Sequence, residues 1–255
     1  MKKVLVDLTV KDVQQLNASC VMLVMTGKEP LPECRPGQFA ELRVDETPSV
    51  MLRRPISIHY VDVSRNEIGF LVQVVGDGTR WMANLSAGEK MNVLLPLGNG
   101  FTIPDDAASK LLLVGGGVGC APLYALAMEL KHLGRDFTML IGARSEKDLY
   151  RREAYEALGR VEYTTEDGSL GERGYVTNHS LLNNKFDYIY TCGPKPMMIA
   201  VAKYARNKNI PCEASLENKM ACGLGACLCC VEDTTDGHRC VCTDGPVFSI
   251  DELKW

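Results

Sequence analysis

A group of cysteines near the end of the chain has the clearest chemical meaning. Cys222, Cys227 and Cys230 follow a C-x4-C-x2-C pattern, and Cys240 and Cys242 come shortly afterwards. This spacing allows four thiolates to hold the two irons of a [2Fe-2S] cluster. The pattern therefore predicts an electron carrier.

The main alternative for the cysteine run is a structural zinc site. Zinc sites usually present two closely spaced pairs of ligands, and the gap between Cys222 and Cys227 is too wide for such a pair. Gly223 and Gly225 lie inside the loop and give it the backbone freedom to turn tightly around inorganic sulfide. The spacing and the glycines favour the cluster.

Six cysteines compete for the four ligand positions. Cys229 directly precedes Cys230 in a tight loop, where its side chain would point elsewhere, so we interpret it as a packed bystander. Spacing does not distinguish Cys240 from Cys242 as the fourth ligand.

Composition indicates a globular protein with room for two ordinary domains. The 255 residues are 46% hydrophobic and 24% charged, and a formal net charge of −4 offers no basic field for nucleic acid. No apolar stretch approaches the roughly twenty residues that span a bilayer, and Met1–Asp7 fits a strand better than a signal peptide. An odd count of 11 cysteines in a long chain fits a reducing cytoplasm better than a disulfide scaffold.

The scattered cysteines and the histidines show no ligand spacing. We expect most of these cysteines to be buried as small apolar residues and the histidines to lie at the surface or in packing contacts. The cysteines are Cys20, Cys34, Cys120, Cys192 and Cys212, and the histidines are His59, His132, His179 and His238.

The first hundred residues alternate short β-rich runs with turn residues. This pattern is typical of an antiparallel β-barrel. The expected strands are Val4–Val10, Cys20–Met25, Gln38–Val44, Ile56–Val61, Ile68–Val75 and Lys90–Leu95.

A different pattern begins near residue 110. A buried strand, a glycine turn, a helix and another apolar strand follow one another, as in a parallel α/β sheet. The expected strands are Leu111–Val114, Phe137–Ile141, Val161–Thr165, Tyr188–Cys192 and Ile210–Ser215, and the expected helices are Ala121–Leu133 and Pro194–Arg206. We therefore expect a barrel domain at 1–101, an α/β domain at 102–215, and a small module at 216–255 that needs a metal to fold.

The segment Arg54, Pro55, Ile56 and Ser57 opens a strand of the barrel and suits a flavin nucleotide. A guanidinium can bind phosphate, and a serine hydroxyl can bond the edge of a flavin ring. Alternation places Arg54 and Ile56 on one face and Pro55 and Ser57 on the other. Solvated strand residues are the ordinary alternative.

The glycine turn Gly76–Arg80 precedes a helical stretch expected at Trp81–Leu85. Such a turn exposes backbone amides and the positive end of a helix to a pyrophosphate. A plain hairpin or cap turn is equally compatible.

A second glycine-rich loop, Gly115–Gly119, follows a buried strand and opens a helix, which is the setting of a dinucleotide-binding loop. Its glycines are Gly115, Gly116, Gly117 and Gly119. Cys120 stands where the G-x-G-x-x-G motif has its last glycine, so we expect a loop of another lineage rather than a mere tight turn. Cys192, Gly193 and Pro194 end a later strand, where parallel sheets bind ligands. Cys192 is a candidate nicotinamide contact, with a buried structural thiol as the alternative.

The choice between NAD and NADP stays open in the sequence. Glu166 and Asp167 would repel a 2′-phosphate, whereas Arg144 and Ser145 would favour one. Sequence does not say which pair faces the ribose.

Taken together, these motifs resemble the ferredoxin-NADP reductase superfamily and, more narrowly, the electron-transfer subunits of class 1B dihydroorotate dehydrogenases. The likeness covers essentially the whole chain, and its most specific pieces are Ala221–Cys227 and Val241–Phe248. In that family the last cluster ligand directly precedes the x-Asp-Gly-Pro-Val-Phe run, so the resemblance favours Cys242. Cys229 and Cys240 are departures from the family pattern.

The resemblance implies FAD in the barrel, NAD docked over the flavin from the glycine loop, and a [2Fe-2S] cluster in the C-terminal module. The implied FAD contacts are Arg54, Pro55, Ile56, Ser57, Val72, Gln73, Val74, Gly78 and Thr79. The implied cluster ligands are Cys222, Cys227, Cys230 and Cys242.

The resemblance also implies a partner, because the chain shows no site for a pyrimidine. An FMN-containing catalytic subunit would oxidise dihydroorotate in a heterotetramer with two copies of each chain, and the cluster module would form part of the interface. Electrons would pass from dihydroorotate through FMN, the cluster and FAD to NAD+, in de novo pyrimidine synthesis. The alternatives are a subunit of a related ferredoxin, sulfide or sulfite NAD(P)H oxidoreductase, and a zinc-stabilised, non-catalytic binding module.

Overall fold

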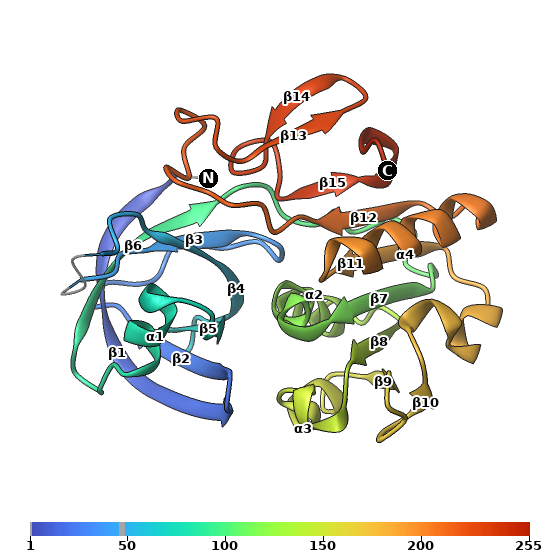
Figure 1. The fold of residues 1–255 in the computed structure, drawn as a ribbon, viewed down its shortest axis with the longest axis horizontal. Coiled ribbons are helices and arrows are strands. Elements are labelled where there is room, and N and C mark those ends of the chain that lie inside the picture. Colours follow the sequence, from blue (N-terminus) through green and yellow to red (C-terminus); the bar gives the residue numbers. More distant parts are fainter. Residues whose placement is uncertain (1, 46–48) are drawn as a thin grey trace.

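The computed structural model describes residues 2–45 and 49–255, which form a β-barrel beside an open sheet, with a C-terminal module across the top of both in Figure 1. The barrel is antiparallel, as the sequence predicts, and it is closed with the strand order β1-β2-β5-β4-β3-β6. Its strands are β1 Val4–Asn17, β2 Cys20–Thr26, β3 Phe39–Leu42, β4 Arg54–Asp62, β5 Glu67–Gln73 and β6 Lys90–Leu97. Strand β1 runs beyond the predicted Val10 because its second half forms a hairpin with β2, in which Asn17 pairs with Cys20.

Strand β3 serves two cores at once. Successive side chains of a strand point to opposite faces, so Ala40 and Leu42 pack inside the barrel. Phe39 instead packs in a core shared with the open sheet and the C-terminal module. The barrel and the rest of the molecule are therefore joined by packed apolar side chains.

The open sheet has the order β10-β9-β8-β7-β11-β12-β15. Its strands are β7 Leu111–Gly116, β8 Phe137–Ala143, β9 Arg160–Thr165, β10 Glu172–Arg173, β11 Tyr188–Cys192, β12 Cys212–Ser215 and β15 Val247–Ser249. The predicted strands pair in parallel, and only β15 is antiparallel to its neighbour among the described residues.

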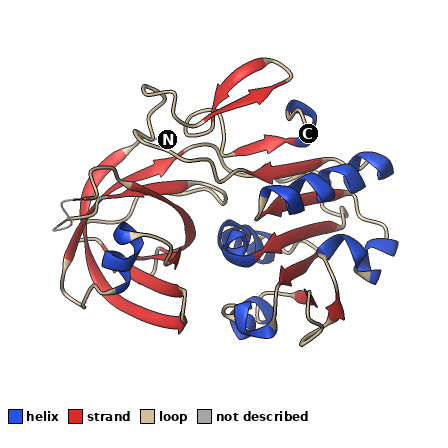
Figure 2. Ribbon diagram, in the orientation of Figure 1, coloured by secondary structure: helices blue, strands red, loops and turns tan. Residues whose placement is uncertain are grey.

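The apolar run of β7 packs against helices on both faces of the sheet. Leu111 and Leu113 lie in the core under helix α2 (Cys120–His132), and Leu112 and Val114 lie in the core under helix α4 (Lys195–Lys208). Such a strand reads as a continuous apolar run because neither face meets water. Figure 2 shows the helices flanking the strands of this sheet.

The helices mostly start and stop close to the predicted residues. They are α1 Asp77–Ala83, α2 Cys120–His132, α3 Arg152–Glu156 and α4 Lys195–Lys208, with short 3-10 turns at Gly117–Gly119, Glu146–Asp148, Val176–Asn178, Ser180–Asn183 and Ile250–Glu252. The prediction for α1 was wrong, since the expected turn Gly76–Arg80 is largely the first turn of that helix. No helix in the described part of the chain has the length and apolar run needed to cross a membrane.

The C-terminal module shares its core with the rest of the chain. It contains a hairpin, β13 Val231–Thr234 and β14 Gly237–Cys240, and the strand β15, which extends the open sheet. Cys230 and Cys242 lie in the same apolar core as Phe39 of the barrel. A segment of this length cannot bury a sufficient core alone, and here it packs against both neighbours.

Candidate functional site

The first cavity lies between the barrel and the open sheet, and the predicted flavin segment forms much of its wall. Arg54, Pro55, Ile56 and Ser57 all line it, together with Gln73 and Thr79. Alternation assigned these four residues to two faces, yet all four reach one cavity. The reason is that β3 pairs with β4 along this stretch, whereas β5 pairs with β4 only from Ile58 onward, which leaves one edge open.

Three of the residues implied to bind FAD do not line this cavity. Val72 is fully buried in the barrel core, and Val74 packs against the same core. Gly78 makes room for a neighbour, because a Cβ there would lie 2.9 Å from Arg54 Nε. Of the strand segment named in the prediction, Gln73 alone lines the cavity.

The Thr79 hydroxyl shapes the turn before α1. Its Oγ1 accepts hydrogen bonds from the Val75 N–H at 2.9 Å and the Gly76 N–H at 3.1 Å, and it donates to the Gly76 carbonyl at 3.0 Å. These bonds draw the chain into helical geometry four residues before the predicted start, which explains the early beginning of α1.

The second cavity, of about 730 Å³, lies along the carboxyl ends of β7, β8 and β9. This is the volume of a pocket for a small organic ligand. Gly116, Gly117, Gly119 and Pro194 line it, as predicted for a dinucleotide loop, whereas Gly115, Cys192 and Gly193 do not.

Two glycines of the loop, Gly115 and Gly119, are needed for close packing, and Gly119 also lines the cavity. A Cβ on Gly119 would lie 2.4 Å from the Cα of Gly193, so the loops that precede α2 and α4 touch backbone to backbone. A Cβ on Gly115 would lie 2.7 Å from the sulfur of Cys120. Close approach of this kind is open only to glycine.

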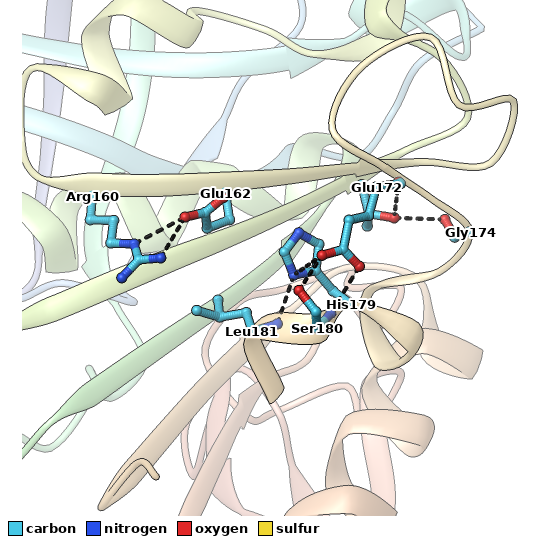
Figure 3. A network of polar contacts seen from close by, with 8 residues as sticks. Arg160, Glu162, Glu172, Gly174, His179, Ser180 and Leu181 are labelled. Carbon is cyan, nitrogen blue, oxygen red and sulfur yellow. Dashed lines mark hydrogen bonds and ion pairs between the residues drawn. The ribbon is translucent and has the colours of Figure 1, made fainter. Parts of the chain in front are cut away.

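A polar network drawn in Figure 3 joins Glu172 and Ser180, which lie on either side of the segment 174–177 that lines the second cavity. The Glu172 carboxylate accepts the Ser180 N–H at 2.9 Å and the Ser180 hydroxyl, and these bonds lower its pKa. His179 Nδ1 accepts the Leu181 N–H at 3.0 Å. Together they fold the segment after β10 so that its residues 174–177 face the cavity.

Glu217 lies where the two cavities meet, since it lines both of them. Burial raises the pKa of its carboxyl, because a charge loses its hydration when it leaves water. Cys192 Sγ lies 3.8 Å from Glu217 Oε1, and burial raises the pKa of this thiol well above its ordinary value. Cys192 is therefore a neutral thiol behind Glu217 and not a nucleophile.

Sequence reasoning did not select Glu217. The one available sign was its position, because it is a lone acidic residue just past the carboxyl end of the parallel strand β12. Ligands of parallel sheets bind at such ends.

The C-terminal module closes the first cavity on its remaining side. Leu216, Asn218, Met220 and Pro246 line it opposite the barrel residues. The chain enters the cysteine loop two residues after Met220. The loop therefore begins at the wall of the predicted flavin cavity.

The cysteine loop directs backbone N–H groups at its sulfurs. Cys222 Sγ accepts the Leu224 N–H at 3.3 Å, Cys242 Sγ accepts the Gly225 N–H at 3.2 Å, and Cys230 Sγ accepts the Cys242 N–H at 3.4 Å. The Leu224 bond and others lower the pKa of Cys222 to about 6, whereas burial raises that of Cys242 to about 12. N–H donors stabilise thiolates, so this donor set fits an iron-sulfur cluster.

The loop backbone is strongly curved. Gly223, Gly225 and Leu228 have φ angles of +65°, +81° and +57°. Cys227 and Cys229 are exposed, Cys230, Cys240 and Cys242 are buried, and Cys222 lies between these classes. Across residues 2–45 and 49–255, no three His, Cys, Asp or Glu side chains are arranged to hold a single metal ion.

Glu41 of β3 packs against the cysteine loop at Gly223. It is fully buried, and neither carboxylate oxygen has a hydrogen-bond partner within the described residues. A Cβ on Gly223 would lie 2.8 Å from Glu41 Cγ, and burial raises the pKa of Glu41 to about 7. An unpartnered buried carboxyl beneath this loop is a further sign that the loop is built around a group with its own polar atoms.

Comparison with known proteins identifies the family. Residues 217–254 match the iron-sulfur cluster binding domain of dihydroorotate dehydrogenase B, and residues 113–203 match an oxidoreductase NAD-binding domain. The dihydroorotate dehydrogenase B (NAD(+)) electron transfer subunit of Listeria monocytogenes serotype 4b (strain F2365) is 42% identical over 241 residues, covering 91% of this chain and 92% of its own. The chain belongs to this family of electron transfer subunits. The Clostridium acetobutylicum member is 42% identical over 222 residues, 87% of each chain.

Solved structures agree with the dihydroorotate dehydrogenase B family assignment. A structure of an NADH-dependent reduced ferredoxin-NADP oxidoreductase superposes with a TM-score of 0.87 at 29% identity, covering 97% of this chain and 90% of that one. The ferredoxin reductase of carbazole 1,9a-dioxygenase has the same fold, with a TM-score of 0.71 at 20% identity, over 82% of this chain and 67% of its own.

Within the dihydroorotate dehydrogenase B family, the cofactor expectations for this chain are confirmed at the level of domains. The matched cluster domain contains all the clustered cysteines, the NAD-binding domain contains the glycine loop, and the barrel is that of flavin reductases. The individual ligand assignments, including Cys242, stay predictions. The thiol of Cys240 also lies near that of Cys230.

Proposed function

We propose that this chain is the electron transfer subunit of an NAD+-dependent dihydroorotate dehydrogenase, working in pyrimidine synthesis. One observation carries the proposal: the flavin cavity adjoins the nucleotide cavity through Glu217 on one side and is closed by the C-terminal module on the other. This order of sites matches the order in which electrons would pass from the cluster to NAD+.

Each cavity offers groups suited to its proposed occupant. In the flavin cavity, Arg54 would bind phosphate and Ser57 would hydrogen-bond the ring. In the nucleotide cavity, the glycine loop stands at the start of α2, where backbone N–H groups favour a pyrophosphate. When bound, the flavin supplies the conversion between a two-electron hydride and the single electrons of the cluster.

Glu217 and Cys192 would shape the place where nicotinamide and flavin meet. The Glu217 carboxyl offers polar atoms to both cavities, and the Cys192 thiol donates to it from behind. Burial raises the pKa of both groups, which disfavours a negative charge beside the reacting carbon.

The partner would be an FMN-containing subunit that oxidises dihydroorotate, in an assembly of two copies of each chain. Leu224 and Leu228, next to the cluster ligands, are 50% and 64% exposed. Exposed leucines beside an exposed Cys227 favour this loop as part of the interface.

Reconstitution tests the proposal. The chain, purified without oxygen, is mixed with NAD+, dihydroorotate and the candidate catalytic subunit, and NADH is followed by absorbance. We expect NADH only when all components are present. Rapid NADH-dependent reduction of ferredoxin, with no dihydroorotate activity, would instead favour the related ferredoxin oxidoreductase that the 29% identical structure represents.

Metal analysis separates the cluster from the zinc alternative. We expect iron and acid-labile sulfide in equal amounts, with visible absorbance beyond that of the flavin. A stoichiometric zinc content without sulfide would contradict the proposed electron path.

A further inference from the structure

One end of the nucleotide cavity carries one guanidinium and two carboxylates. Arg144 follows β8 and Glu166 follows β9, and both line the cavity together with Asp148. Glu217 marks the opposite end, beside the flavin cavity. A dinucleotide with its nicotinamide near Glu217 and its pyrophosphate on the glycine loop would place its adenosine ribose beside these charges.

Arg144 is already paired with an anion of the protein. Its Nη2 lies 3.5 Å from Asp148 Oδ1, and the Ser145 hydroxyl donates to Asp148 Oδ2 at 3.1 Å. The side chain of Arg144 is 80% exposed and that of Asp148 is 22% exposed. Asp148 is therefore the less exposed member of this ion pair and is held in place by Ser145. Its negative charge offsets the positive charge that Arg144 offers to a ligand.

Glu166 adds a second carboxylate at the same end. Its N–H donates to the Ala143 carbonyl at 3.1 Å, which fixes the ends of β8 and β9 against each other. Within residues 2–45 and 49–255 its carboxylate has no hydrogen-bond or ion-pair partner, so it is free to accept a bond from a ribose hydroxyl.

The neighbouring Asp167 does not share this role. Its carboxylate accepts the Ser169 N–H at 3.0 Å and the Ser169 hydroxyl at 2.6 Å, and it does not line the cavity. The sequence offered Glu166 and Asp167 together as the residues that would repel a 2′-phosphate. In the structure, the two carboxylates that line the cavity are those of Glu166 and Asp148.

We propose that Asp148 and Glu166 together make the site selective for NAD over NADP. Asp148 forms an ion pair with the guanidinium of Arg144, and Glu166 accepts a hydrogen bond from the 2′-hydroxyl, which NADP lacks. A 2′-phosphate would meet two carboxylates and one guanidinium that is already paired, so its binding is opposed by net negative charge. This inference rests on the proposed function, because it takes the cavity to be the NAD site.

The test uses the purified, FAD-loaded chain and ferricyanide as electron acceptor, with NADH or NADPH as donor. The variants are Asp148→Asn, Glu166→Gln and the double variant, with Asp167→Asn as the matched control. We expect the ratio of kcat/KM for NADPH to that for NADH to rise about tenfold in each single variant and further in the double one. The gain should come from a lower KM for NADPH, because the nicotinamide end is untouched.

A further variant identifies the group that receives the phosphate. Adding Arg144→Ala to Asp148→Asn should cancel the gain in NADPH use, and added salt should reduce the gain as exposed charges are screened. Flavin absorbance and the unfolding midpoint confirm that each variant is folded and loaded.

Three outcomes would overturn the inference: equal use of both donors by the wild type, an unchanged ratio in the folded double variant, or an equal change in Asp167→Asn. If the wild type oxidises neither donor, the proposed function itself fails, and the two failures are thereby distinguished.

Discussion

His59 and Tyr124 stack with ring centroids 4.3 Å apart and planes inclined by 19°, and this contact joins the barrel to the nucleotide-binding sheet. His59 belongs to β4 and Tyr124 to α2. Arg151 donates to His59 Nε2, so Nδ1 carries the hydrogen and donates to the Ala121 carbonyl at 3.1 Å. Since Ala121 lines the flavin cavity, the strand that opens with the flavin residues also fixes the helix that follows the glycine loop.

Replacing His59 by phenylalanine should weaken this junction. The ring stack is kept, but the Ala121 carbonyl and the Arg151 guanidinium lose a buried partner, which costs about 1–3 kcal/mol of folding free energy. Urea unfolding followed by fluorescence measures the loss. The control is His132, an exposed residue of α2, the helix that also contains Tyr124. His132→Phe should leave the unfolding midpoint nearly unchanged. Equal effects of the two substitutions would contradict a special role for His59.

The stability of the chain should fall in mild acid because of His59. Burial, and then the Arg151 charge, lowers the pKa of this imidazole to about 3, against an ordinary value of 6.5. Between these values the unfolded chain binds a proton that the folded chain does not, so the stabilisation is complete above pH 6.5 and decreases as pH falls toward 3. The slope is about 1.4 kcal/mol per pH unit. The other groups facing the ring are Tyr60, Tyr124 and Tyr155.

Unfolding free energies measured from pH 7 to pH 5 test this contribution. The wild type should lose stability more steeply than His59→Phe over that range. Parallel curves for the two proteins would show that other groups control the acid response.

Gly223→Ala should prevent cluster incorporation. The residue has φ +65°, and an added Cβ would lie 2.8 Å from Glu41 Cγ. Gly134→Ala is a matched control, because Gly134 also has φ +65° but has no atom within 4 Å of the added Cβ. The control should cost about 1 kcal/mol of backbone strain and keep its iron. Iron and sulfide per chain are the measurement, and full iron loading of the Gly223 variant would contradict the packing argument.

Cys227→Ser should separate the two halves of the electron path. Loss of this predicted ligand should remove the cluster and stop transfer to or from the partner. NADH should still reduce bound FAD at close to the wild-type rate in stopped-flow absorbance. Cys229→Ser, at an exposed position two residues away, should keep both activities. Loss of FAD reduction in a folded Cys227 variant would contradict the proposed order of cofactors.

The fourth cluster ligand can be assigned by comparing Cys240→Ser with Cys242→Ser. The Cys242 sulfur accepts a bond from Gly225 inside the loop, whereas Asp244 accepts the backbone N–H of Cys240 in the turn that follows. We expect the Cys242 variant to lose iron and the Cys240 variant to retain it. The reverse result would move the assignment to Cys240.

The pattern of apolar residues along the sequence predicts the strands well where apolar side chains dominate a face of the strand. The apolar run Leu111–Val114 and the barrel strands follow directly from burial, and the cysteine spacing identifies the cluster loop without any knowledge of the fold. The start of α1 was missed because one hydroxyl, that of Thr79, decides it through local hydrogen bonds.

Other features depend on contacts between distant segments, which a linear pattern does not contain. Val72 and Val74 belong to the strand that was predicted to bind flavin, but the closure of the barrel turns them toward its core. Glu217 acquires its importance only because β12 ends where two cavities meet. The strand β15 is too short to be seen by alternation and forms because β12 offers it an unpaired edge.

The pairing of β15 with β12 also limits how the redox centre can travel. In many electron carriers, a flexible linker lets the redox domain move between successive partners. Here the polypeptide that leaves the cysteine loop pairs with the edge of the nucleotide sheet through β15, which holds the loop beside the flavin wall. We therefore expect the catalytic partner subunit to dock at the cysteine loop itself.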